Sequence, residues 1–361
     1  MCQHTDHSPH RHTIFCILPP YILSQIAQNG SAQQRTNALQ TLRTDQTFRT
    51  FRATTPHPTG AVLGQRGAAV EEGQKQRTIY TARNTQTLPG TVVRAEGAPP
   101  TGDPAADEAY DGLGTTYDFY WDVFQRNSID DEGLPLNATV HFDVQYNNAF
   151  WDGTRMVFGD GDGELFNRFT IALDVIGHEL THGVTEDEAS LTYMFQPGAL
   201  NESISDVFGS LIKQRALNQT ADKADWLIGA GLFTKNVQGV ALRSMKAPGT
   251  AYDDPVLGKD PQPARMNDFV RTYQDNGGVH INSGIPNHTF YLVATKLGGY
   301  AWEKAGRIWY ETLRDSTLRP STGFMRFARI TSTVAERLYG ANSPEQQAVQ
   351  ESWAEVDLSL T

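Results

Sequence analysis

The stretch Val175-Ile176-Gly177-His178-Glu179-Leu180-Thr181-His182 contains the pattern H-E-x-x-H. On an α-helix, residues four apart lie on one face, so the imidazoles of His178 and His182 can both reach one metal ion. Glu179 lies about 100° around such a helix, beside the metal. The apolar neighbours can hold the helix in the protein interior. The stretch therefore predicts a buried helix, over residues 170–185, that carries two metal ligands.

A catalytic zinc ion needs a third protein ligand and an open position for water. A third histidine at position 188 would complete one zinc pattern, but Glu188 stands there. Glu202 and Asp206 follow instead, four residues apart on a second predicted helix, 200–217. One carboxylate can bind the metal while the other orients the free ring N–H of a histidine. H-E-x-x-H is a signature of zinc metalloproteases, so this spacing favours a zinc peptidase site.

The composition of the chain is that of a globular protein and excludes several classes. It has 361 residues, enough for two or three domains, with 39% hydrophobic and 20% charged residues. A net charge of -11 argues against a nucleic-acid partner. No run of 18 apolar residues indicates a membrane span. Cys2 and Cys16 are the only cysteines, which excludes a disulfide framework and a four-cysteine zinc site.

Residues 1–57 differ from the rest in charge. They hold five arginines and two aspartates, a net charge of +3, whereas the remainder has 25 basic and 39 acidic residues, a net charge of -14. The start is polar and His-rich, and the apolar run 14–18 is interrupted by two prolines, so we see no Sec signal peptide. We therefore expect a cytoplasmic protein, or one secreted by a non-classical route. Residues 29–60 read as a weak helix followed by an exposed linker.

The body changes character near residue 170. Before it, strands are predicted at 77–81, 90–94, 139–144 and 156–158, with one helix at 107–127. After it the pattern is mostly helical, with helices predicted at 170–185, 200–217, 284–298, 301–317, 321–339 and 344–356. This predicts an α+β protein with a β-rich lobe, 58–169, and a helical lobe, 170–361.

Five motifs in a fixed order carry a family resemblance. They are Asn147-Asn148-Ala149-Phe150-Trp151, the H-E-x-x-H, Asn201-Glu202 with Asp206, Ala241-Leu242-Arg243-Ser244-Met245, and Asp275-Asn276-Gly277-Gly278-Val279-His280-Ile281-Asn282-Ser283-Gly284. Over about residues 75–361 the sequence resembles the thermolysin family of zinc metalloproteases (gluzincins), and more narrowly the protealysin-like precursors. The resemblance implies a thermolysin-like two-lobe fold with zinc in the cleft between the lobes.

The resemblance also implies roles for the catalytic residues. His178, His182 and Glu202 match the zinc ligands, and Asp206 the residue that supports them. Glu179 matches the general base, which takes a proton from the zinc-bound water. Tyr193 and His280 match the family's oxyanion-binding pair, and Asp275 matches the acid that orients His280.

Substrate-binding residues are implied in the same way. Asn148 and the backbone of Ala149 match the sheet edge that pairs with an extended substrate, and Arg243 the guanidinium that binds the carbonyl after the cut. The pocket for the residue after the cut should be apolar, which implies cleavage on the N-terminal side of bulky hydrophobic residues. Its matched residues are Phe166, Phe169, Val175, Ile228, Leu232 and Leu242.

The leader resembles the propeptide motif of protealysin-like precursors at Pro19-Pro20-Tyr21. A Pro-rich segment is extended and stiff, so it loses little entropy on entering a cleft. We hypothesise that residues 1–57 are a propeptide whose Pro19-Pro20-Tyr21 stretch occupies the active-site cleft. A surface-packed apolar segment is the alternative, and Cys16 is a further candidate zinc ligand.

The family's calcium-binding acids are only partly present. Asp174 and Asp225 match two carboxylates of the double calcium site, whereas Lys213, Leu227 and Ala230 stand at other matched positions, and Val240 replaces an aspartate of the single site. Calcium needs six to eight oxygen ligands. We expect Lys213 to form a salt-bridged cluster with Asp174 and Asp225, and the sequence argues against Ca²⁺ at the double site.

These observations together predict a monomeric zinc endopeptidase, made as a precursor. Its partners would be peptide and protein substrates and its own propeptide, with no nucleic acid and no membrane. One zinc ion is the expected cofactor. A catalytically silent zinc-binding relative with a protease fold is the alternative, and an extracellular adhesion module would be a third class.

Overall fold

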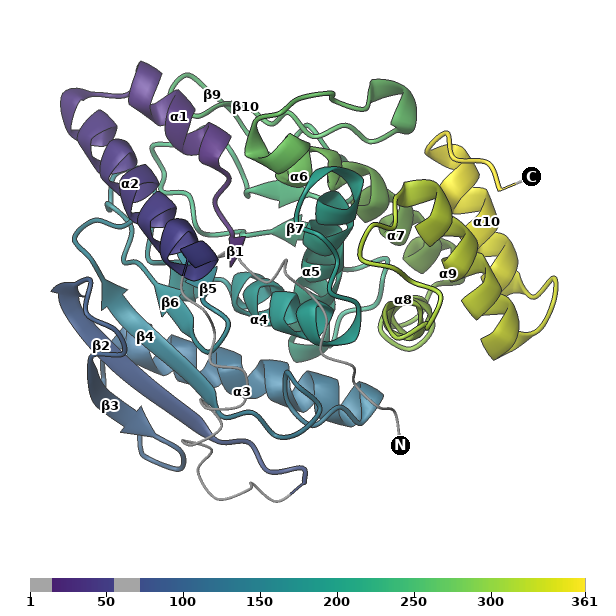
Figure 1. The fold of residues 1–361 in the computed structure, drawn as a ribbon, viewed down its shortest axis with the longest axis horizontal. Helices are drawn as coiled ribbons and strands as arrows, with labels where there is room; N and C mark the ends of the chain where they lie inside the picture. The colour runs from purple at the N-terminus through teal and green to yellow at the C-terminus, as the bar shows by residue number, and fades with distance from the viewer. Residues whose placement is uncertain (1–14, 55–71, 361) are drawn as a thin grey trace.

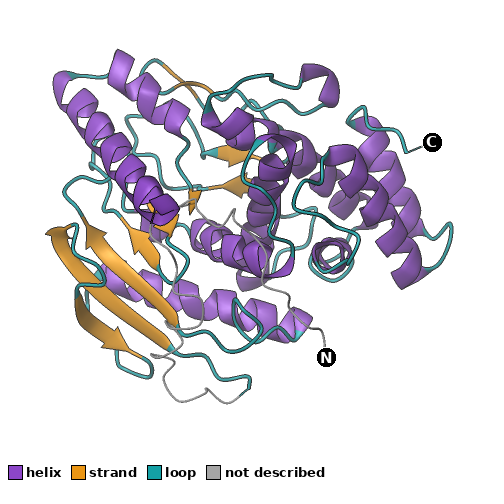
Figure 2. Cartoon of the chain, in the orientation of Figure 1, coloured by secondary structure: helices purple, strands orange, loops and turns teal. Residues whose placement is uncertain are grey.

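The computed structural model describes residues 15–54 and 72–360. Figure 2 shows the long strands gathered in one lobe and the other lobe made mainly of helices, so the two-lobe α+β architecture predicted from the sequence is confirmed. The larger sheet has six strands in the order β1-β5-β6-β4-β2-β3. Their bounds are Phe15–Cys16 (β1), Arg77–Thr85 (β2), Thr91–Ala95 (β3), Leu136–Phe142 (β4), Ala149–Trp151 (β5) and Met156–Phe158 (β6).

The long helix α3, Pro104–Phe124, packs against this sheet. It begins three residues earlier than the sequence predicted, because Asp103 caps it: the Asp103 side chain accepts a hydrogen bond from the Ala105 N–H, and proline fills the first helical position. Strands β2, β4 and β6 are parallel neighbours, and β5 runs antiparallel to β6. One edge of the sheet is the short strand β1, and β5 lies between β1 and β6.

Helix α4, Leu173–Glu188, carries the H-E-x-x-H and lies between the lobes (Figure 1). It starts and ends three residues later than predicted, because Phe169–Ile171 forms a separate 3₁₀ turn. Every residue from Asp174 to Thr185 is buried. Helix α5, Phe195–Ala216, packs along it and starts five residues earlier than predicted.

Two glycines set how closely α4 and α5 approach. A Cβ atom added at Gly209 would lie 2.4 Å from the Asp174 carbonyl oxygen and 3.1 Å from the His178 nitrogen. One added at Gly177 would lie 3.2 Å from the Gly209 Cα. The two backbones therefore touch directly, and this contact fixes the register of α5 against α4.

Helices form the rest of the second lobe (Figure 1). They are α6 (Asp275–Asn282), α7 (Gly284–Leu297), α8 (Ala305–Leu313), α9 (Phe324–Tyr339) and α10 (Pro344–Glu355). Helix α8 is shorter than the predicted 301–317. Small elements before α6 are β7 (Leu227–Ile228), β8 (Arg243–Ser244), β9 (Asp253–Asp254), β10 (Gly258–Lys259) and a 3₁₀ turn, Met266–Asp268. Within the described residues, no helix combines the length and apolarity needed to cross a bilayer.

The N-terminal segment forms a helical hairpin, α1 (Pro20–Asn29) and α2 (Ala32–Thr54), beside the sheet (Figure 1). Helix α2 is longer and more regular than the weak helix expected. Its docked face is mostly polar, which explains why the hydrophobic pattern did not show it. The buried residues of that face include Gln34, Asn37, Ala38, Thr41, Thr44 and Asp45.

The glycine contact between α4 and α5 can be tested by Gly209→Ala. The added methyl group would overlap the Asp174 carbonyl and force the helices apart, so we expect a loss of about 1–3 kcal/mol in the free energy of unfolding, measured with urea. Ala216→Ser, at the exposed end of the same helix, is the control and should change little. Equal stability of Gly209→Ala and the parent would refute the contact.

Candidate metal centre

Three buried side chains converge between α4 and α5. The Nε2 atoms of His178 and His182 lie 3.0 Å apart. Glu202 places its Oε2 3.5 Å from the His178 Nε2 and its Oε1 3.4 Å from the His182 Nε2. All three residues are buried, and among the described residues this is the one such cluster of potential metal ligands.

The other ring nitrogens of the histidines are held by α5. His178 Nδ1 donates to Asp206 Oδ1 at 2.8 Å, and His182 Nδ1 donates to Asn201 Oδ1 at 2.7 Å. A proton on each Nδ1 leaves a lone pair on each Nε2. Burial, and after it the neighbouring His178, keep the pKa of His182 well below its usual value, so its imidazole stays neutral.

These atoms fit a zinc ion. Ligand atoms bonded at about 2.0–2.1 Å around a tetrahedral ion lie roughly 3.3 Å apart, close to the separations above. Two lone pairs facing each other across 3.0 Å repel unless a cation lies between them. Glu202 Oε2 is buried and has no hydrogen-bond partner within the described part of the chain.

Glu179 lies beside the cluster. Its Oε2 accepts a hydrogen bond from the Trp151 N–H at 3.1 Å, and its Oε1 is buried without a described partner. Burial, with the charge of Glu202 second, raises the pKa of Glu179 well above its usual value. A carboxylate with a raised pKa accepts and releases protons nearer neutral pH.

His280 and Tyr193 lie beside Glu202. His280 Nε2 is 3.4 Å from Glu202 Oε2 and 3.3 Å from the Tyr193 hydroxyl, which itself donates to Glu202 Oε1. Asp275 fixes the ring through His280 Nδ1, at 2.6 Å. Burial alone would lower the pKa of His280, but the Asp275 and Glu202 carboxylates outweigh it, and the pKa is raised.

Arg243 is tied to the same network. Its Nε and Nη2 donate to the two oxygens of Asp206, each at 2.8 Å, and Asn287 Nδ2 donates to Asp206 Oδ2 at 2.8 Å. Burial alone would raise the pKa of Asp206, but Arg243 and His178 hold it well below its usual value. Asp206 is therefore a buried, ionised group that joins His178 to Arg243.

The N-terminal segment fills the space between these groups. β1 pairs antiparallel with β5, and the Phe15 ring stacks on the His182 ring at 4.3 Å between centroids. Asn148 and Ala149 hydrogen-bond to the same segment. The six residues expected to form an apolar pocket are all buried: Phe166, Phe169, Val175, Ile228, Leu232 and Leu242.

The position of the leader differs in detail from the expectation. We expected Pro19-Pro20-Tyr21 to occupy the cleft; the residues immediately before it, Phe15–Leu18, lie against His182, His280 and Arg243, and Tyr21 is half-buried close to Arg243 and Asp275. Pro19 caps α1 and Pro20 is its first residue, so the stiff extended stretch ends there. The Cys16 side chain packs in an aromatic cluster, and burial raises the pKa of its thiol, which does not favour a thiolate ligand.

Lys213 lies near the other end of the α5 face that carries Glu202. Its Nζ is 2.8 Å from Asp174 Oδ2 and 2.9 Å from Asp225 Oδ1, and it donates to the Leu227 carbonyl. Burial alone would lower the Lys213 pKa, but the two carboxylates raise it. The ammonium thus stands among oxygens that could otherwise face a cation.

Sequence reasoning missed Asp45 of α2. It is buried, its Oδ1 accepts from the Tyr146 hydroxyl, and its Oδ2 accepts from Asn148 Nδ2 at 2.9 Å. Only Asp6 and Asp45 are acidic in the basic leader. A single acidic residue within a basic helix was the sequence signal that could have indicated this contact.

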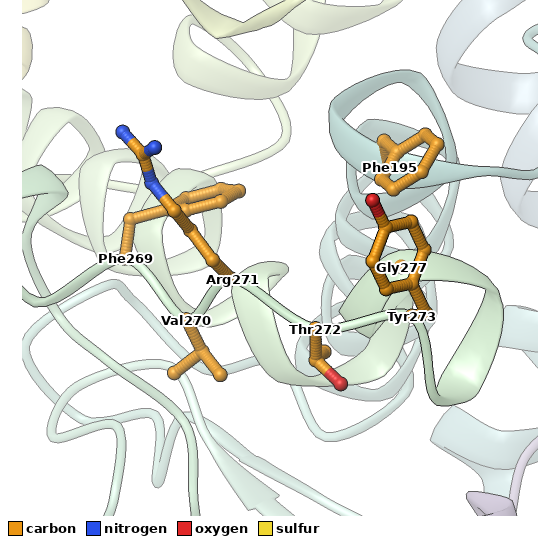
Figure 3. Close-up of a pocket in the computed structure, with 7 residues that line it drawn as sticks. All are labelled: Phe195, Phe269, Val270, Arg271, Thr272, Tyr273 and Gly277. Atoms are coloured by element: carbon orange, nitrogen blue, oxygen red, sulfur yellow. The ribbon is translucent and has the colours of Figure 1, made fainter.

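A separate hollow of about 230 Å³ opens near α6 (Figure 3). Phe195 and Tyr273 form one side of it, with ring centroids 6.3 Å apart, and Tyr273 is 92% exposed. The hollow is lined by Gly277, but the ligand triad lies elsewhere, so we assign it no catalytic role.

Comparison with known proteins agrees with this geometry. The model of the thermolysin metallopeptidase catalytic domain matches residues 28–186, and that of the alpha-helical domain matches residues 189–358. An extracellular metalloprotease of Pectobacterium carotovorum subsp. carotovorum is 55% identical over 347 residues, 96% of this chain and 97% of the relative. An extracellular minor metalloprotease of Serratia marcescens is 46% identical over 291 residues, 80% and 79% of the two chains.

A solved structure, the precursor of protealysin, a metalloproteinase from Serratia proteamaculans, superimposes with a TM-score of 0.87. It is 55% identical and covers 96% of this chain and 100% of its own. Fold and ligand set together define a zinc-dependent metalloendopeptidase. The chain belongs to the thermolysin family of metallopeptidases.

The comparisons overturn the expected location. We expected a cytoplasmic protein or one secreted by a non-classical route, because no Sec signal peptide was visible. That expectation is wrong, because relatives at 55% and 46% identity are named extracellular. Sequence pattern alone gave no positive signal for either location.

The role of Asp206 can be tested by metal affinity. Asp206→Ala should weaken zinc binding by about 10–100-fold, because His178 loses the acceptor that orients it. Asp206→Asn tests the charge with the shape retained. Affinity is measured by competition with a chromophoric chelator. Ser203→Ala on the same helix is the control, since the Ser203 hydroxyl is buried without a described partner. Unchanged affinity in both Asp206 variants would exclude it from the site.

Proposed function

We propose that this chain is the autoinhibited precursor of a secreted zinc endopeptidase that cleaves on the N-terminal side of bulky hydrophobic residues. The observation that carries this is the buried triad of His178, His182 and Glu202 with Glu179 beside it. Secretion is proposed from the names of the relatives. We place the propeptide at residues 1–57, the β-rich lobe at 58–169 and the helical lobe at 170–361.

Bound zinc would polarise a water molecule and the substrate carbonyl. Glu179 is the base that accepts the water's proton and passes it to the leaving amine. His280 donates from Nε2 to the oxygen of the substrate carbonyl as negative charge develops there, and Asp275 keeps that nitrogen aimed. Tyr193 supplies a second donor once its hydroxyl turns from Glu202.

Three groups position the substrate. Once the N-terminal segment is removed, β5 is an edge strand that pairs with an extended chain through the Ala149 backbone, and Asn148 hydrogen-bonds to the next residue. Arg243, held by Asp206 through Nε and Nη2, binds a carbonyl with Nη1. The six apolar residues around Val175 form the pocket that selects a bulky hydrophobic side chain, because a polar one would lose its hydration there.

The N-terminal segment inhibits by occupying these same groups. Its helix α2 docks through a polar face, which is typical of interfaces that must separate again. Asp45 anchors that face to Asn148, a residue we assign to substrate binding. Removal of the segment therefore exposes the cleft and releases Asn148 together.

Calcium plays no part at the α4–α5 interface in this proposal. Lys213 fills the position between Asp174 and Asp225 with one positive charge. An ammonium at 2.8–2.9 Å from both carboxylates leaves no room for a cation with six to eight oxygen ligands. Stability should then depend on the salt-bridged cluster.

The assignment of Glu179 as base is tested by Glu179→Gln, which keeps the shape and removes the proton acceptor. We expect kcat/KM on a peptide substrate to fall at least 10²–10⁴-fold, roughly the contribution of general acid–base catalysis, with zinc content unchanged. The matched control is Glu186→Gln on the same helix. If Glu179→Gln were as active as an active parent, Glu179 would not be the base. If parent and variant were both inactive, the alternative of a catalytically silent zinc-binding relative would be favoured.

The calcium proposal is tested by thermal and urea unfolding. A calcium-selective chelator should barely shift the Tm. Lys213→Ala should cost about 3 kcal/mol, because Asp174 stays buried without its partner. Lys296→Ala, which removes an exposed ion pair with Glu355, should cost less than about 1 kcal/mol. A large fall in Tm on calcium removal would contradict the proposal.

A further inference from the structure

Four consecutive residues, Phe15–Leu18, lie across the groups that we assign to catalysis: Phe15 and Cys16 form strand β1, and Ile17 and Leu18 continue it as a bend. Phe15 pairs with Trp151 and Cys16 with Phe150, and the Ile17 N–H donates to the Ala149 carbonyl at 3.2 Å. Antiparallel addition to a sheet edge is a common way for proteins to bind extended peptides. Each peptide unit of the segment can therefore be compared with a position along a bound substrate.

The carbonyl of Cys16 faces the metal centre. His280 Nε2 donates to it at 3.1 Å, and the same nitrogen lies 3.4 Å from Glu202 Oε2. His280 is the donor that we assign to the reacting carbonyl. The Cys16 carbonyl thus occupies the position of the carbonyl to be attacked.

The following peptide unit meets the groups expected after the cut. The Ile17 N–H lies within hydrogen-bonding reach of the Glu179 carboxylate as well as of the Ala149 carbonyl. Arg243 Nη1 donates to the Ile17 carbonyl at 3.2 Å, and the Ile17 side chain is fully buried. The nitrogen of a leaving amine would stand beside the base in this register.

Leu18, the next residue, contacts Asn148, which we assign to substrate binding. Its N–H donates to Asn148 Oδ1 at 3.0 Å, and Asn148 Nδ2 lies 3.5 Å from its carbonyl oxygen. Beyond it, Ile22, Leu23 and Ile26 of α1 are fully buried. A cut in the strand would therefore leave its C-terminal part anchored.

We propose that Phe15–Leu18 is bound in the register of a substrate, with the Cys16–Ile17 peptide bond at the position of the bond to be cleaved. This rests on the proposed peptidase function. In hydrolysis, the water oxygen bonds to the Cys16 carbonyl carbon and the bond to the Ile17 nitrogen breaks. Glu179 carries the proton to that nitrogen, leaving a Cys16 carboxylate and an Ile17 amine.

The docking is tested without activity, by thiol labelling of the full chain. A Cys2→Ser, Glu179→Gln background leaves Cys16, which is 1% exposed, as the sole thiol and prevents self-cleavage. Ile17→Asp should speed labelling by a maleimide at least 10-fold, because a charged side chain cannot be buried there; Ile17→Ser is a milder second variant. Leu39→Asp, at an exposed position of α2, is the control and should leave the labelling rate unchanged. Labelling of both Ile17 variants at the parent rate would overturn the proposal.

The register is tested with a synthetic peptide of residues 13–23. The peptide is incubated with the zinc-loaded full chain carrying Ile17→Asp, whose cleft should be open. The products are then identified by mass spectrometry. We expect a cut between Cys16 and Ile17, and none there in a peptide carrying Asp at position 17. Cleavage elsewhere, or none by a preparation that degrades casein, would overturn the register. A preparation that degrades neither would instead refute the proposed function.

Discussion

The direct backbone contact between α4 and α5 is the constraint on which the metal centre depends. Glu202, Asp206, Gly209 and Lys213 are spaced by four, three and four residues, so they share one face of α5. They meet Asp174, His178 and His182 of α4 in antiparallel order. Because no side chain separates Gly177 from Gly209, this register has little freedom, and the ligand atoms lie close together before any metal binds.

Asp206 links that helix pair to the rest of the cleft. It takes hydrogen bonds from His178, Arg243 and Asn287 while fully buried. Its charge is balanced by Arg243, which makes burial tolerable. One carboxylate therefore orients a metal ligand and, through Arg243, a group that contacts the carbonyl of the bound N-terminal strand. We expect metal affinity and peptide binding to be coupled through this residue.

Much of this could be predicted from the sequence, because it depends on regular helix geometry. Four-residue spacing placed His178 with His182 and Glu202 with Asp206, and the change in pattern near residue 170 separated the lobes. Helix α2 could not be read in this way. Its positions 34, 38, 41, 45 and 48 have helical spacing, but Gln34, Thr41 and Asp45 are polar, and they bond to residues of the β-rich lobe, so the hydrophobic signal is weak. Strands β1 and β5 are two and three residues long, too short for any periodicity.

In the proposed precursor, two histidines and one glutamate hold a zinc ion, and the strand at Cys16 lies beside it with its thiol turned elsewhere. X-ray absorption at the zinc edge of the full-length chain tests this most directly. We expect one zinc per chain, bound only by nitrogen and oxygen atoms at about 2.0–2.2 Å. A sulfur ligand at about 2.3 Å would show Cys16 bound to the metal instead, and the absence of stoichiometric zinc would contradict the metal centre itself.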